Sequence, residues 1–154
     1  MLTPEQISDR LELQQLVTDY ANAIDAREFE KLDRIFTPDA HIDYTAMGGI
    51  AGPYPKIRAW LPEALKPFPA YLHFIGNLSF QVDGDAATGQ VACINPITLP
   101  VLGTVYIALW YRDRYRRTPD GWRICERVEH CCHMPRWMRL AAKLQQRKKQ
   151  GNPD

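Results

Sequence analysis

The first part of the chain carries hydrophobic residues at the spacing of an α-helix. They recur every three or four positions and would form one apolar stripe: Leu13, Leu16, Val17, Tyr20, Ala21 and Ile24. The polar residues around them are expected to face solvent: Asp9, Arg10, Glu12 and Gln15. Thr3 before Pro4, with Gln6 three residues after Thr3, is typical of a capped helix start. We therefore predict a long helix that ends near Asp25.

The pattern then changes from helices to strands. A short amphipathic helix is predicted over residues 28–36, before the breaker Thr37-Pro38-Asp39, a short strand over 41–44, and a third helix over 56–65 that Pro62 breaks or kinks. Four strands follow, at 71–82, 89–95, 104–116 and 122–133, with turn-forming residues between them. A last helix is predicted over 136–149. Helices first and strands later predict an α+β domain with an antiparallel sheet.

The predicted strand over 104–116 is apolar on both faces. One face carries Tyr106, Ala108 and Trp110, and the other carries Val105, Ile107, Leu109 and Tyr111. In a domain of this size the helices can cover only one face of an open sheet. A large exposed apolar patch is unusual on a monomer, so we expect the other face to meet a second subunit in a homo-oligomer.

Composition narrows the class of protein. The 154 residues, 45% hydrophobic and 24% charged, predict one domain over 1–154 with a substantial core. A net charge of +1 gives no electrostatic basis for binding nucleic acid or an anionic membrane surface. The longest apolar stretch, residues 94–111, is interrupted by prolines and a glycine, so no membrane span is predicted.

The chain start and the cysteines indicate the compartment. No basic segment leads into an apolar one near residue 1, so we expect no secretion signal and a cytoplasmic location. Cysteines in that reducing compartment should remain thiols. The cluster His130-Cys131-Cys132-His133 lacks the usual zinc-ligand spacing, and adjacent residues of a strand point to opposite faces. We predict no metal site.

Two residues are candidates for acid–base chemistry. His73 lies among apolar and aromatic neighbours, where an imidazole can act as a general base if a carboxylate fixes its tautomer. Asp25, at the end of the first helix, could supply that carboxylate. The alternative interpretations are a hydrogen-bonded core histidine and a solvated aspartate in a turn.

The pattern leaves open the role of Tyr20 and the side of the sheet on which Arg127 lies. Tyr20 belongs to the apolar stripe and points inward, either as a core aromatic or as a phenol that polarises a carbonyl or donates a proton. Strict alternation along the last strand puts Arg127 on the face of Cys125, Glu129 and Cys131, opposite Ile124 and Val128, and either face could be outside.

Four segments carry a resemblance to a known family. They are residues 8–16 with Tyr20 and Asp25, then Phe36-Thr37-Pro38-Asp39-Ala40, His73-Phe74-Ile75-Gly76-Asn77 and Asp120-Gly121-Trp122-Arg123-Ile124. Over nearly its whole length the chain resembles the SnoaL-like branch of the nuclear-transport-factor-2-like superfamily. The interval of 48 positions from Asp25 to His73 is similar to the spacing in hexachlorocyclohexane dehydrochlorinases and bile-acid 7α-dehydratases.

The resemblance implies a fold and a site. The fold is a cystatin-like cone, in which N-terminal helices pack on a curved, mostly antiparallel sheet that encloses a cavity. Asp25 and His73 match a catalytic dyad, Arg127 an assisting arginine, and Tyr20 the tyrosine of the dehydratases. The dehydrochlorinases carry a lysine in place of this tyrosine, which favours loss of water over loss of chloride. Scytalone dehydratase uses a second histidine on the next strand, whereas this chain has Thr98 or its neighbours there.

The expected function is that of a cofactor-independent lyase, a dehydratase that acts by β-elimination on a small, mostly apolar cyclic or polycyclic molecule. Aromatic residues expected to line the cavity are Phe36, Tyr44, Trp60 and Trp110. Two alternatives stay open. One is a ketosteroid-isomerase-like or polyketide-cyclase-like enzyme, which shares the proton abstraction; the other is a non-catalytic ligand-binding or structural module. A homotrimer is implied by the resemblance.

Overall fold

A computed structural model describes residues 1–150 of the chain. The helical elements are α1 (Pro4–Asp25), η1 (Phe29–Arg34), η2 (Thr45–Met47), α2 (Tyr54–Leu65) and α3 (Arg136–Gln150). The strands are β1 (Phe36–Asp43), β2 (Ala51–Pro53), β3 (Ala70–Tyr71), β4 (Phe74–Asp83), β5 (Ala86–Leu99), β6 (Gly103–Thr118) and β7 (Gly121–His133). The predicted second helix is a 3-10 helix, β1 begins before the expected breaker, and α2 continues through Pro62 to Leu65.

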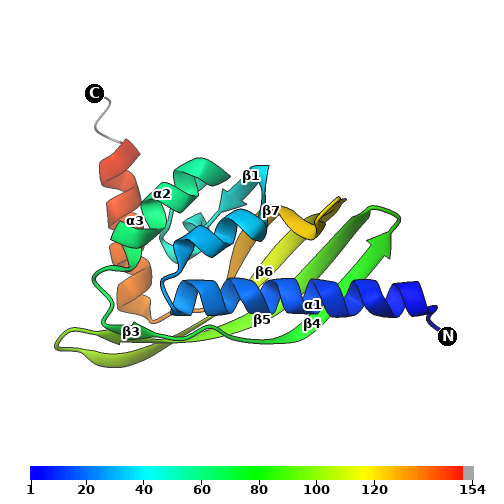
Figure 1. The fold of residues 1–154 in the computed structure, drawn as a ribbon. Helices are drawn as coiled ribbons and strands as arrows, with labels where there is room; N and C mark the ends of the chain where they lie inside the picture. The colour runs from blue at the N-terminus through cyan, green and yellow to red at the C-terminus, as the bar shows by residue number, and fades with distance from the viewer. Residues whose placement is uncertain (151–154) are drawn as a thin grey trace.

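The strands form one curled sheet in the order β2-β1-β7-β6-β5-β3, with β4 also paired to β5. All neighbours are antiparallel except β1 and β7, which run parallel. Figure 1 shows α1 crossing one face of this sheet, with α2 and α3 near the end of α1 that is farther from the N-terminus. The predicted α+β class with a curved, mostly antiparallel sheet is confirmed.

The start of α1 has the capping box that the sequence predicts. The Thr3 hydroxyl accepts a hydrogen bond from the Gln6 backbone N–H at 3.2 Å, and the Gln6 side-chain oxygen accepts one from the Thr3 backbone N–H at 3.0 Å. One face of the helix then packs on the sheet, with Leu13, Val17 and Ile24 at 2% exposure or less.

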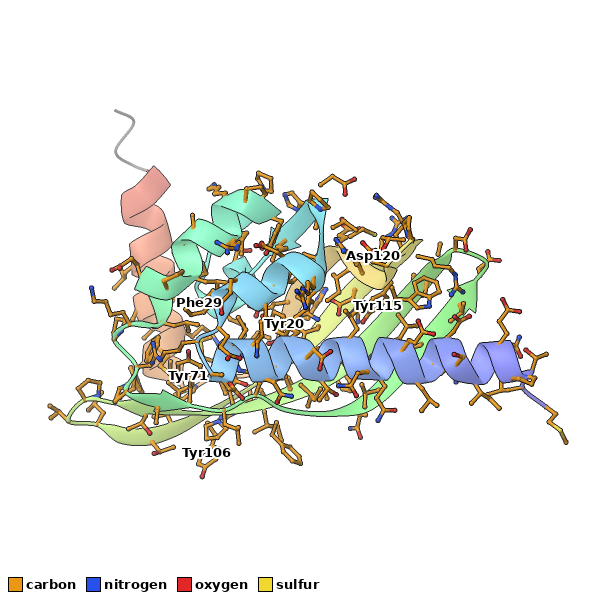
Figure 2. The ribbon with its side chains drawn as sticks, in the orientation of Figure 1. Tyr20, Phe29, Tyr71, Tyr106, Tyr115 and Asp120 are labelled. Carbon is orange, nitrogen blue, oxygen red and sulfur yellow. The ribbon has the colours of Figure 1, made fainter. Side chains whose placement is uncertain are left out.

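The sheet has an inner face toward α1 and an outer face away from it. Inner-face residues form the core: Val91, Cys93, Leu109, Tyr111, Tyr115 and Ile124. The outer face is polar at one end and apolar at the other. Figure 2 shows Tyr106 on the outer side, directed away from α1.

A β-bulge at Cys125 overturns the strict alternation predicted for β7. Ile124 pairs with Tyr115 of β6, and Arg127 pairs with Asp113, so an advance of three positions on β7 matches an advance of two on β6. The extra residue, Cys125, lets Ile124 and Arg127 both face inward. The expected opposition of Ile124 and Arg127 is therefore wrong, and Arg127 belongs to the inner face.

Asp9 anchors α1 to the hairpin of β6 and β7. Its carboxylate accepts hydrogen bonds from the Trp122 indole N–H and from an Arg117 Nη, both at 3.0 Å, and Arg117 stacks over the Trp122 ring at 4.4 Å. The residue is only 4% exposed, so the expectation that it faces solvent is wrong. Helical periodicity alone could not reveal partners that lie more than one hundred positions away.

We predict that Asp9→Asn destabilises the fold by about 2 kcal/mol at neutral pH, because hydrogen bonds to a charged group are lost. The bonds from Arg117 hold the pKa of Asp9 below its ordinary value of 3.8. A lowered folded-state pKa stabilises the fold above the ordinary value, and this contribution is lost as the pH falls through the lowered one. Urea unfolding between neutral and acidic pH should show the two proteins converging in stability at low pH. A constant difference would contradict this assignment.

Candidate active site

His73 and Asp25 are in direct contact. The Asp25 Oδ1 lies 2.6 Å from His73 Nδ1, and the same carboxylate accepts the His73 backbone N–H at 2.9 and 3.1 Å. Asp25 is the last residue of α1, and His73 lies between β3 and β4, so the contact joins the helix end to the sheet. A carboxylate at Nδ1 favours the tautomer with its proton on that nitrogen, which leaves Nε2 free to accept another. The side chains are 8% (His73) and 18% (Asp25) exposed.

Tyr20 lies beside the dyad and forms a hydroxyl pair with Tyr44. The two phenol oxygens are 2.9 Å apart, and the Tyr20 ring meets the His73 ring edge-on at 6.2 Å. Figure 2 shows Tyr20 between α1 and the sheet. Burial raises the pKa of both phenols above the ordinary 10.0, so both carry their protons at neutral pH and can donate hydrogen bonds.

Arg127 lies behind Tyr20 and is fully buried. Its Nε and Nη2 donate to the two carboxylate oxygens of Asp113 at 2.8 and 2.6 Å, and its guanidinium stacks between Tyr20 at 4.0 Å and Tyr111 at 4.2 Å. Burial lowers the pKa of Arg127, but the adjacent Asp113 charge and hydrogen bonds outweigh it and hold the pKa well above its ordinary value. Within residues 1–150, Nη1 has no hydrogen-bond partner. The geometry gives Arg127 contact with Tyr20 but no surface to offer a substrate.

Of the four aromatic residues expected to line a cavity, three lie around the Tyr20–Tyr44 pair and Trp110 lies apart from them. Tyr44 and Trp60 are neighbours with ring centres 6.4 Å apart, and Tyr44 also touches the dyad region through Tyr20. Phe36 is 1% exposed and stacks on Tyr54 at 5.1 Å, so it is core. Trp110 is on the outer face, because it alternates with the buried Leu109 and Tyr111. Trp110 therefore cannot line a cavity shared with His73.

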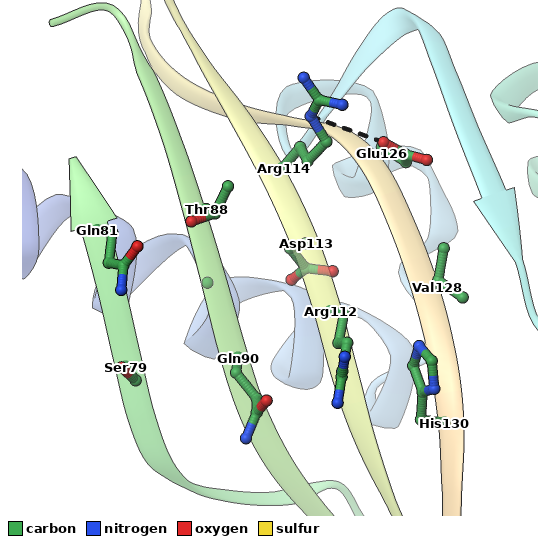
Figure 3. Close-up of a pocket in the computed structure, with 11 residues that line it drawn as sticks. Ser79, Gln81, Thr88, Gln90, Arg112, Asp113, Arg114, Glu126, Val128 and His130 are labelled. Carbon is green, nitrogen blue, oxygen red and sulfur yellow. Dashed lines mark ion pairs between the residues drawn. The ribbon is translucent and has the colours of Figure 1, made fainter. Parts of the chain in front are cut away.

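A hollow on the outer face is distinct from the dyad. Figure 3 shows its lining, which is mainly polar: Ser79, Gln81, Thr88, Gln90, Arg112, Arg114, Glu126 and His130. Neither His73 nor Asp25 contributes to it. The sheet separates this hollow from the inner face.

Three residues of the inner face were given no role from the sequence. Asp113 and Tyr111 hold Arg127, and Glu129 is the next inward position after Arg127 on β7. Asp113 continues the alternation of Leu109 and Tyr111, so an acidic residue in an apolar series was an available signal. Alternation put Glu129 on the face of Arg127, but it could not show that this face is the inner one.

The cysteines are thiols, and one of them is buried. All four cysteines are free, and burial raises the pKa of Cys93 to about 12, which makes it a poor nucleophile. The described residues contain no group of three or more His, Cys, Asp or Glu side chains that could hold a metal ion. Within residues 1–150, no helix combines the length and apolar content needed to cross a bilayer.

Comparison with known proteins identifies relatives along most of the chain. The model of the SnoaL-like domain family matches residues 5–128. The uncharacterized protein Rv2910c of Mycobacterium tuberculosis (strain H37Rv) is 54% identical over 134 residues, which is 86% of this chain and 91% of that one.

Solved structures share the fold. The Kfla4162 protein from Kribbella flavida superposes with a TM-score of 0.78 at 25% identity, over 87% of this chain and 97% of that one. Hexachlorocyclohexane dehydrochlorinase LinA-type3 from Novosphingobium barchaimii superposes with a TM-score of 0.73 at 20% identity, over 84% of this chain and 90% of that one. At 20% identity the second match bears on the fold alone.

Proposed function

This chain belongs to the SnoaL-like domain family, and from that premise we propose that it is a cofactor-independent lyase that removes water from a small, mostly apolar cyclic molecule. The observation that carries the proposal is the 2.6 Å contact between Asp25 Oδ1 and His73 Nδ1. A buried imidazole whose tautomer is fixed by a carboxylate is suited to accept a proton from carbon.

The proposed reaction begins at the carbon beside a carbonyl group. Nε2 of His73 takes the proton, the electrons of the broken C–H bond form a C=C bond, and the C–O bond to a hydroxyl group on the β-carbon breaks. Tyr20 and Tyr44 supply hydroxyl groups that can hydrogen-bond to the carbonyl oxygen as negative charge develops there. Asp25 stabilises the imidazolium that forms.

Arg127 has a positioning role in this proposal. Its charge is matched by Asp113, and it is 0% exposed, so we do not assign it contact with substrate. Stacking under the Tyr20 ring fixes the phenol in place and lowers its pKa, although burial still dominates.

The test uses the wild-type protein with a β-hydroxy cyclohexanone. Water loss would give an unsaturated ketone with a mass lower by one water, which mass spectrometry detects. An isomerase or cyclase would give a product of unchanged mass. Binding of the ketone with no conversion, across a series of hydroxylated cyclic ketones and thioesters, would favour the non-catalytic module. A protein that is stable only with a larger partner chain would also favour it.

We also propose that the apolar end of the outer face joins copies of this chain in a homo-oligomer, with a trimer as the expected size. Three neighbouring side chains there are largely exposed: Phe74 at 66%, Ile94 at 48% and Tyr106 at 61%. Such a strip is unusual on a monomer. The free thiols agree with the proposed cytoplasmic location.

We predict that Ile94→Lys dissociates the oligomer, because a charge would be buried in the subunit contact. Thr88→Lys is the matched control, since Thr88 lies on the same strand and face at the polar end. Sedimentation velocity should give an oligomer for the wild type and the control, and a monomer for Ile94→Lys. A monomeric wild type would overturn the proposal.

A further inference from the structure

Glu129 is an acidic residue on the inner face with no partner. It pairs across β6 and β7 with Tyr111, whose side chain is buried in the core, and it follows Arg127 at the next inward position. The residue is partly exposed. Among the side chains that the structure describes, none makes a hydrogen bond or an ion pair with its carboxyl group, in contrast to Asp25 and Asp113. A polar group in this position is available to a ligand.

The cross-strand partner of Glu129, Tyr111, links it to the residues around the dyad. The Glu129 charge acts on Tyr20, Tyr44 and Tyr111, and it acts on Cys93 together with the charge of Asp25. The Tyr20 ring in turn lies beside both the Tyr111 and His73 rings. Glu129 is therefore connected to His73 through the neighbouring rings of Tyr111 and Tyr20.

The charges around Glu129 favour its neutral form. Burial of the carboxyl group is the largest cause that raises the pKa of Glu129 well above 4.5, and the carboxylates of Asp43 and Asp113 raise it further. Arg127 opposes the shift, but both hydrogen bonds that its guanidinium makes go to Asp113. Among the side chains that the structure describes, Arg127 is the one cation that shifts the pKa of Glu129.

We propose that Glu129 is the general acid that protonates the leaving oxygen, an inference that rests on the proposed lyase function. As His73 Nε2 accepts the proton from carbon and the C–O bond breaks, the Glu129 hydroxyl gives its proton to the departing oxygen, which leaves as water. The enzyme then holds an imidazolium and a carboxylate. Transfer of one proton from His73 to Glu129 restores the starting state, so the sum is substrate to unsaturated ketone plus water.

A carboxylic acid suits this task better than the nearby phenols. Tyr20 and Tyr44 have pKa values raised above 10.0, so they donate hydrogen bonds but part with a proton reluctantly. Hydroxide is a poor leaving group and needs a proton as the C–O bond breaks. A leaving group that departs as a stable anion needs none, and this difference makes the proposal testable.

The experiment compares a β-hydroxy cyclohexanone with its acetate ester, which leaves as acetate. Glu129→Gln should lower kcat for the hydroxy compound by about 100-fold or more, and for the acetate by less than about 3-fold. The matched control is Glu126→Gln, on the same strand but on the outer face beside Arg114, which should leave both rates unchanged. Equal losses on both compounds, or no loss on either, would overturn the proposal.

A second measurement does not depend on turnover. The carboxyl ¹³C signal of Glu129 in the free protein, assigned by its absence in Glu129→Gln, should show a protonated acid at pH 7. An ionised Glu129 would overturn the inference even if the protein is an active lyase. If the wild type converts neither compound and does not bind cyclohexanone, the proposed function fails, whereas the ¹³C titration still decides whether Glu129 carries the proton.

Discussion

Replacing His73 by alanine should lower kcat for water loss from the β-hydroxy cyclohexanone by about 1,000-fold or more, because it removes the proposed base that takes the proton from carbon. His73 holds the one imidazole that contacts the Asp25 carboxylate, and its removal leaves the Tyr20–Tyr44 pair without a base. The measurement is the rate of enone formation at saturating substrate. Binding of cyclohexanone, which cannot react, should change little.

Asp25→Asn is the companion variant. An asparagine keeps the size of the side chain but lacks the charge that fixes the imidazole tautomer and stabilises the imidazolium. We expect a loss of rate comparable with that of His73→Ala, with a folded protein by circular dichroism. Arg27→Lys, at a residue that bonds the carbonyls of Leu65 and Phe68 near the same helix end, tests for a general structural effect and should keep most of the activity. Near-wild-type turnover in His73→Ala would rule out the proposed mechanism.

Asp113→Asn should destabilise the protein by about 3–5 kcal/mol, because it leaves the Arg127 charge buried without a counter-charge. Both side chains of the pair are 0% exposed, so no water can replace the lost carboxylate. Urea unfolding at neutral pH measures the change in the free energy of unfolding. Asp39→Ala removes an ion pair with Arg116 whose side chains are more than half exposed, and it should change stability little.

A double variant separates the charge from the packing. Asp113→Leu with Arg127→Met removes both charges and should recover much of the stability that Asp113→Asn loses, because the desolvation penalty of the pair also disappears. The loss of stability in the double variant is compared with the losses in Asp113→Leu and in Arg127→Met alone. If it equals their sum, Arg127 acts through its packing alone. An Asp113→Asn protein as stable as the wild type would contradict the assignment of a buried ion pair.

The periodic elements of the fold could be read from the sequence because their signals are local. The stripe on α1 and the alternation on β6 each depend on neighbours a few positions away, and both elements are found where they were expected. The pairing of Asp25 with His73 was suggested by a family spacing, since nothing in the local pattern joins the end of a helix to a residue between two strands.

The errors share a physical cause. Strict periodicity assumes that every residue of a helix or strand takes the face that its position gives it, and a bulge or a distant partner breaks that rule. The bulge at Cys125 reversed the relation between Ile124 and Arg127, and the distant partners of Asp9 drew a polar residue into the core. Trp110 was misplaced because both faces of its strand are apolar, so composition could not tell inside from outside. Partners across the sheet, not neighbours along the chain, decide such positions.

The anchoring of α1 at both ends restricts where this chain can change in length. Asp9 is bonded to the β6–β7 hairpin and Asp25 to His73, and only rigid helix connects them. One residue inserted between these anchors would advance Asp25 by about 1.5 Å and turn it by about 100°, which breaks its bond to His73. Insertions in the turn between β4 and β5 leave both anchors of α1 in place. Homologues that keep the dyad should therefore vary in length at their turns while the interval from residue 9 to residue 25 stays constant.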